Sequence, residues 1–190
     1  MLAAAAIVFV GLQTADGQAV KPLSNADAEK TKLKTVAVNT RDLQSFPYDA
    51  GSVKFIVSST DTDGAWSLVE IIELSGYHTN LHRHNHTSEA FYVLEGVLTV
   101  RLNDKTVDYP AGSYVLIPPG TPHAQGNRGT VPAKLLLTMT PAGFEISFRD
   151  RAELFKTMKA DDPNYKKKRK ENAAKESYDV EFLEDWDLKK

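Results

Sequence analysis

The sequence predicts an all-β fold, an antiparallel sandwich or barrel, followed by a helical C-terminal extension. From Ser52 onward, short runs of β-branched and aromatic residues recur between turn residues, which is typical of such folds. After Arg149 the apolar residues recur at helical spacing instead. A chain of 190 residues is long enough to bury a substantial core, and we expect one domain with extensions.

Turn residues separate the expected elements. Asp61–Gly64 has the composition of a hairpin turn, and Asn103-Asp104 forms a second turn. A helix is expected over Arg149–Ala160. Asp162-Pro163 predicts the start of another helix, which runs to Tyr178, because proline is favoured at the first helical position. Six runs are expected to be strands: Val53–Val57, Trp66–Leu74, Phe91–Leu94, Val97–Leu102, Tyr114–Ile117 and Lys134–Met139.

The elements divide the chain into four segments. We expect a barrel over 51–148 and a helical tail over 149–190, preceded by an extension or linker over 20–50. Residues 1–19 are expected to be a signal peptide, because an apolar run, 1–12, is followed by small residues. The mature chain would then begin close to Val20 and be secreted or periplasmic; without cleavage a cytoplasmic location is expected. The apolar run is too short to span a membrane.

Composition excludes several kinds of function. The formal net charge is −2, so nucleic acid is not an expected partner. The chain has no cysteine, which excludes disulfides, thiolate catalysis and cysteine-ligated zinc sites.

Histidines cluster in one short stretch. Four of the five histidines lie between positions 78 and 86, and the fifth is His123. Side chains two residues apart in a strand share a face, so His82 and His84 point the same way and Arg83 points away. With Glu89 close behind and His123 distant in sequence, they form a candidate nitrogen and oxygen site for a divalent transition metal (Fe, Ni, Mn, Cu, Co or Zn). The alternative is a half-buried strand that carries polar residues by chance.

The spacing of glycines around these residues forms two motifs. The first runs from Gly76 through His82-x-His84 and Glu89 to Gly96, and the second from Gly112 through Pro118-x-Gly120 and His123 to Asn127. Together they resemble the paired motifs of the cupin superfamily. The chain from Asp61 to Glu145 is similar to single-domain cupins related to quercetin dioxygenase, and the tail from Tyr178 to Leu183 resembles a common ending of these proteins. The resemblance implies an antiparallel, jelly-roll-like cupin β-barrel in which His82, His84, Glu89 and His123 bind one metal ion. His78 and His86 match no ligand position.

The same resemblance implies a function. It is that of a quercetinase-like dioxygenase, which oxidises a flavonol or a related small aromatic or enol substrate with dioxygen. Glu89 is then the candidate catalytic base, and Tyr92 is the alternative base. Relatives often carry proline where this chain has Asn80, which leaves the substrate open.

Two other functions stay open. One is a non-oxidative metal-dependent isomerase, lyase or decarboxylase acting on a small acid, for which Arg83 and Arg101 are the candidate cationic groups. The other is a small-molecule-binding protein without turnover. Small β-barrels need their exposed edge strands covered, and cupins commonly pair, so we expect a homodimer.

Overall fold

The computed structural model describes residues 33–159, 161–173, 178–186 and 188. The expected signal peptide, 1–19, and the expected cleavage near Val20 lie outside the described residues and stay predictions. The same holds for residues 20–32 of the expected linker.

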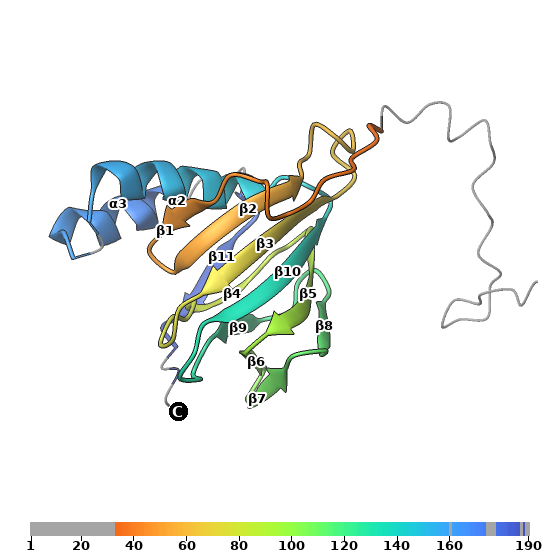
Figure 1. Ribbon diagram of the computed structural model, residues 1–190. Helices are drawn as coiled ribbons and strands as arrows, with labels where there is room; N and C mark the ends of the chain where they lie inside the picture. The colour runs from red at the N-terminus through yellow and green to blue at the C-terminus, as the bar shows by residue number, and fades with distance from the viewer. Residues whose placement is uncertain (1–32, 160, 174–177, 187, 189–190) are drawn as a thin grey trace, which may run out of the picture. The chain divides into compact units, whose positions relative to one another are not determined.

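Two antiparallel sheets confirm the all-β prediction (Figure 1). Every predicted strand is present. The six-stranded sheet has the order β1 (Phe46–Tyr48), β2 (Gly51–Val57), β3 (Ser67–Glu73), β10 (Ala133–Thr140), β5 (Ser88–Glu95), β8 (Tyr114–Ile117). The five-stranded sheet has the order β11 (Glu181–Glu184), β4 (Leu81–Arg83), β9 (His123–Gly126), β6 (Val97–Leu102), β7 (Lys105–Pro110).

Alternation along each strand builds the core between the sheets. In β5, Glu89, Phe91 and Val93 are buried whereas Tyr92 is exposed, so Phe91 and Val93 share the face of Glu89. Apolar side chains of both sheets join one cluster, with Leu135 from one sheet and Leu98 from the other. Burying a side chain such as that of Phe91 stabilises the fold by about 1.5–3 kcal/mol.

Two turns connect consecutive strands, one between β5 and β6 and one between β6 and β7. Gly96, between β5 and β6, has a φ of +73°, and a Cβ there would lie 2.7 Å from the carbonyl oxygen of Pro132. Only glycine fits that position without displacing backbone. Asn103 has a φ of +52° and, with Asp104, forms the predicted turn that pairs β6 with β7.

Helix α2 spans Glu145–Thr157 and therefore begins before the expected Arg149. The Glu145 carboxylate is buried and accepts hydrogen bonds from the backbone N–H of Gly143 at 2.6 Å and of Ser59 at 3.0 Å. The hydroxyl of Ser67 donates a third, at 3.0 Å. Contacts with distant residues therefore fix this helix start, and local spacing does not reveal it. Helix α3, Pro163–Ala173, begins at the predicted proline.

Asp49 ties both helices to the sheet. It lies between β1 and β2, where its carboxylate accepts hydrogen bonds from Arg151 Nη2 of α2 at 2.7 Å and from Arg169 Nη1 of α3 at 2.6 Å. Figure 1 shows α2 and α3 beside these two strands. Burial would raise the pKa of Asp49, but the two guanidinium groups outweigh burial and lower it.

Besides β4 and β9, which carry His82 and His123, three strands lie outside the expected runs. Strand β1 lies within the predicted linker 20–50, β7 follows the Asn103-Asp104 turn, and β11 lies within the predicted helical tail 149–190. β1 pairs with β2, and β11 pairs with β4. Pairing with a neighbouring strand therefore determines these two strands more than their local propensity does. Among the described residues, no helix has the length and apolar character needed to cross a membrane.

Candidate metal centre

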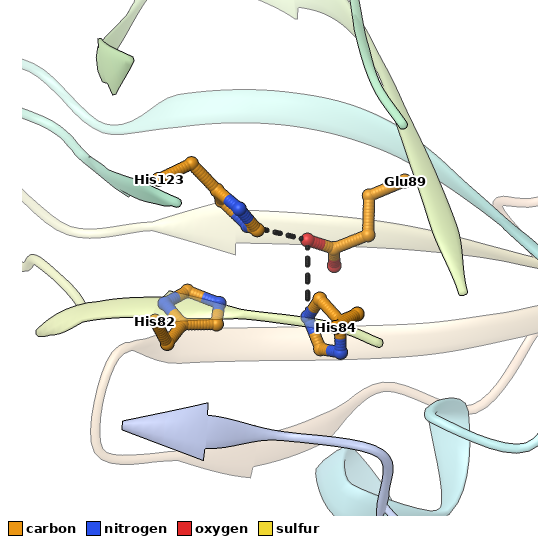
Figure 2. A group of neighbouring side chains, drawn as sticks. All are labelled: His82, His84, Glu89 and His123. Atoms are coloured by element: carbon orange, nitrogen blue, oxygen red, sulfur yellow. Dashed lines mark hydrogen bonds and ion pairs between the residues drawn. The ribbon is translucent and has the colours of Figure 1, made fainter. Parts of the chain in front are cut away.

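All four predicted ligands meet between the two sheets (Figure 2). His82 lies on β4, His84 directly follows that strand, and His123 lies on β9, directly paired with His82. Glu89 comes from β5 of the other sheet. These four residues, the ligand set, are all buried. One nitrogen or oxygen atom from each lies within 4.8 Å of those of the others.

The carboxylate of Glu89 lies between two imidazoles. Its Oε2 atom is 2.9 Å from His123 Nε2 and 3.3 Å from His84 Nε2, the two contacts drawn in Figure 2. The rings of His82 and His123 lie 4.3 Å apart between centroids. Nε2 of His84 and Nε2 of His123 thus face the carboxylate across the gap between the sheets.

Backbone carbonyls fix the orientation of all three rings. His82 Nδ1 lies 2.8 Å from the oxygen of Asn80, His123 Nδ1 lies 2.9 Å from that of Thr121, and His84 Nδ1 lies 2.9 Å from that of Asp179. A carbonyl oxygen can only accept, so each Nδ1 carries the hydrogen and donates it. In a neutral ring, Nε2 then carries the lone pair, which is how a histidine is prepared to bind a metal ion.

The arrangement fits a divalent transition metal. His84 Nε2 is buried and has no hydrogen-bond partner among the described residues. Neutral Nε2 atoms and a carboxylate are all acceptors, so they repel one another unless a proton or a cation lies among them. Three imidazole nitrogens and one carboxylate oxygen suit iron, nickel, manganese, copper, cobalt or zinc.

Charge within the ligand set favours an ionised carboxylate. Burial alone would raise the pKa of Glu89, but His84 and His123 outweigh it and hold the pKa well below its usual value. Burial, with His123 adding to it, lowers the pKa of His82 to about 3, so this ring is neutral. Burial also opposes protonation of His84, yet Glu89 outweighs burial and raises the pKa of His84.

The candidate cationic groups are engaged on the outer side of the sheet. As alternation predicted, Arg83 points away from His82, and its Nε donates to Glu181 of β11 at 2.9 Å. Arg101 Nη2 lies 2.7 Å from Glu184, also of β11. Both arginines therefore pair with acidic residues of one strand.

Other residues singled out in the sequence lie outside the ligand set. Tyr92 is 43% exposed and on the opposite face of β5 from Glu89. The structure therefore contradicts its role as the alternative base. His78 packs edge-on against Trp186, with 5.9 Å between ring centroids, and His86 is exposed.

Three further residues were not predicted. Glu73 is buried on the core face of β3, and its Oε1 accepts a hydrogen bond from Gln125 Nε2 at 2.9 Å. Burial raises the pKa of Glu73 to about 7. Gln125 follows His123 by two residues, and this alternation could have placed it on the ligand face. Asp179 carries no local signal of its contact with His84.

Comparison with known proteins supports the cupin superfamily. Residues 68–139 match the family model described as Cupin domain. An uncharacterized protein of Methanocaldococcus jannaschii is 39% identical over 75 residues, which are 40% of this chain and 60% of that protein. This chain thus spans about three-fifths of that relative's length. A tetracenomycin polyketide synthase protein of Streptomyces glaucescens is 26% identical over 117 residues, 61% of this chain and 74% of that protein.

Solved structures share the fold. The polyketide cyclase RemF of Streptomyces resistomycificus has a TM-score of 0.50 and 20% identity, covering 56% of this chain and 80% of that one. An RmlC-like cupin of Shewanella frigidimarina has a TM-score of 0.51 and 18% identity, covering 60% of this chain and 98% of that one. At these identities the likeness extends to the fold alone.

Proposed function

We propose that this protein, whose residues 68–139 match the family model described as Cupin domain, is a metal-dependent dioxygenase that oxidises a flavonol or a related aromatic or enol substrate. The observation that carries the proposal is the buried set of three imidazoles and one carboxylate, with each Nδ1 bound to a carbonyl. His82, His84, Glu89 and His123 would hold one divalent metal ion. When bound, the ion supplies a Lewis acid.

Glu89 is the residue suited to move a proton. Its pKa is held well below the usual value by His84 and His123 against the effect of burial, so it is ionised at neutral pH. Its Oε2 atom faces these two histidines, and no described residue forms a hydrogen bond with Oε1. Oε1 is therefore the atom that would accept the proton of a substrate hydroxyl, within the reach that general-base catalysis requires.

Apolar neighbours support an aromatic substrate. Ile117 of β8 and Met139 of β10 pair directly with Glu89 on either side, and both are buried. A flat apolar ring gains most from such surroundings. The pairing of Arg83 and Arg101 with β11 argues against a small acid, since a small anionic substrate generally needs a cationic partner.

A second candidate is a non-oxidative metal-dependent reaction on a polyketide. It is favoured by the relative named as a tetracenomycin polyketide synthase protein, which is 26% identical over 61% of this chain. The same ligand set would serve, with Glu89 as the proton acceptor and no consumption of dioxygen.

Oxygen uptake separates the candidates. Purified protein is analysed for metal and supplied in turn with iron, nickel, manganese, copper, cobalt and zinc. Dioxygen is then followed with a panel of flavonols and of polyketide-type aromatic compounds. Flavonol-dependent oxygen uptake is the expected result. Turnover without uptake would favour the second candidate, and tight binding with no turnover under any metal would contradict an enzymatic function.

A further inference from the structure

A C-terminal segment lies along β4, the strand that carries His82 and is directly followed by His84. Strand β11 pairs antiparallel with β4, placing Phe182 opposite His82 and Glu181 opposite Arg83. Beyond the strand, Trp186 and Leu188 pack with Leu81 and Ala124 of β4 and β9 in a small separate core. The segment is outside the residues that match the cupin domain, 68–139, yet it contacts the site they form.

Asp179, just before β11, binds the loop between two ligands. This loop, residues 85–87, connects His84 to the strand of Glu89. The Asp179 carboxylate accepts three backbone hydrogen bonds: Oδ1 from Asn85 N at 3.1 Å, and Oδ2 from His86 N and Thr87 N, both at 2.8 Å. Burial would raise the pKa of Asp179, but these N–H groups outweigh it and lower the pKa. An ionised carboxylate that accepts several N–H groups forms strong, charge-assisted bonds.

The backbone of Asp179 acts on the ligand itself. Its carbonyl oxygen accepts the Nδ1–H of His84 at 2.9 Å. His82 and His123 use carbonyls two residues earlier in the chain, at Asn80 and Thr121. The acceptor of His84 instead lies 95 residues later. His84 is thus the one ring of the three whose orientation depends on a distant segment.

We propose that Asp179 is a positioning residue for the metal site. Its carboxylate fixes the loop that separates His84 from Glu89, and its carbonyl oxygen fixes the tautomer of His84 that presents Nε2 to a divalent transition metal. The proposal rests on the metal binding put forward above. It adds that the ligands of the cupin domain reach their geometry only with the C-terminal segment in place.

The backbone conformation at Asp179 permits a clean test. Its φ is +52°, a left-handed value that glycine adopts without strain. Asp179→Gly therefore removes the carboxylate while keeping the backbone carbonyl. Asp179→Asn keeps the size of the side chain but removes its charge and one of its acceptor oxygens. Glu184→Gln is the matched control, because Glu184 lies in the same segment, is exposed and pairs with Arg101 outside the ligand set.

Two measurements are made on each full-length variant. Titration with Co²⁺ gives the affinity, and hydrogen–deuterium exchange of the metal-free protein gives the protection of the amides of loop 85–87. Asp179→Gly is expected to lower Co²⁺ affinity by about 10- to 100-fold, the usual loss when a residue supporting a ligand is removed. The loop amides should exchange faster. Asp179→Asn should show a smaller effect in the same direction, and Glu184→Gln should match the wild type.

Unchanged Co²⁺ affinity together with unchanged loop exchange in Asp179→Gly would overturn the proposal. If that variant does not fold, the same result in Asp179→Asn overturns it. Failure of the wild type to bind any divalent metal would contradict the proposed function instead. The amide exchange of the metal-free protein would still show whether Asp179 holds the loop.

Discussion

At the scale of single residues, the three imidazoles are held by their Nδ1 hydrogens, and the Nε2 atoms of His84 and His123 face Glu89. His123→Ala removes one of these nitrogens and leaves a gap between His82 and Glu89. We expect the purified variant to lose its bound metal, as measured by elemental analysis. The control is His86→Ala, because His86 is exposed and outside the ligand set. Full occupancy in His123→Ala would show that the ligand set is wrong.

Glu89→Gln separates metal binding from proton transfer. The amide keeps the shape of the side chain but loses the charge that His84 and His123 stabilise. The three imidazoles should still bind metal, more weakly, whereas turnover should fall by about 100- to 10,000-fold, the usual effect of losing a general base. Activity per bound metal is the quantity to compare. A near wild-type rate would reduce Glu89 to a structural ligand.

Glu73 should make stability depend on pH. Burial raises the pKa of Glu73 from 4.5 to about 7. Between these two pH values the folded state therefore holds a proton on Glu73 that the unfolded state has released. The contribution of protonated Glu73 to stability is complete below pH 4.5 and is lost as the pH rises through about 7. The shift corresponds to about 3 kcal/mol.

Urea unfolding of the wild type and Glu73→Gln at pH 4.5 and pH 8 tests this contribution. We expect the wild type to lose stability relative to the variant between these two values. Glu95→Gln, an exposed carboxylate at 73%, is the control and should follow the wild type. A constant difference between wild type and Glu73→Gln across this range would contradict the expectation.

At the scale of elements, Asp49 is the point that holds α2 and α3 against the sheet. Asp49→Ala leaves the guanidinium of Arg151, whose side chain is only 15% exposed, without its carboxylate, a loss that typically costs about 3–5 kcal/mol for a buried pair. The free energy of unfolding should fall by that amount. Glu153→Ala removes an exposed pair with Lys156 on α2 and should cost under about 1 kcal/mol. Equal losses in the two variants would show that Asp49 is not an anchor.

Most strands of the two sheets could be predicted because their own residues have high β propensity. Tyr114–Ile117 and Val97–Leu102 have the observed bounds of β8 and β6, since β-branched runs end there at turn residues. Strands β1 and β11 are short and depend on the neighbours with which they pair. The early start of α2 depends on hydrogen bonds from Ser59 and Ser67 to Glu145. Such distant partners leave no pattern in the local sequence.

The four candidate ligands could be predicted from the sequence, but the surrounding residues Glu73 and Asp179 could not. Motif spacing and strand alternation located His82, His84, Glu89 and His123, which the structure brings together. Their role as ligands stays a prediction. Glu73 lies inside an apolar run, and Asp179 is far from the motifs, so neither spacing nor alternation connects them to the site.

At the scale of the whole molecule, one edge strand of the six-stranded sheet favours a homodimer. The two edges of that sheet are β1 and β8, and β8 carries Tyr114 at 61% and Leu116 at 55% exposure. One edge of the other sheet, β7, carries charged Lys105 and Asp108, which oppose pairing. Light scattering at micromolar concentration should give a dimer mass for the wild type.

The β8 edge can be tested by placing a charge on it. Leu116→Lys should yield monomers, because a lysine would have to be buried in the contact. Val107→Lys on β7, also an exposed apolar position, should remain dimeric. A monomeric wild type would reject the homodimer, and a dimeric Leu116→Lys would place the contact elsewhere.

The late position of Asp179 in the chain has a consequence for how the protein is made. Synthesis proceeds from the N-terminus, and His84 precedes the carbonyl that orients it by 95 residues. At about 5–20 residues per second, roughly 5 to 20 seconds pass between the two. During that interval the nascent chain already carries His82, His84 and Glu89, and later His123, but loop 85–87 has no carboxylate to hold it. The final geometry of His84 can therefore form only after the ribosome has passed Asp179.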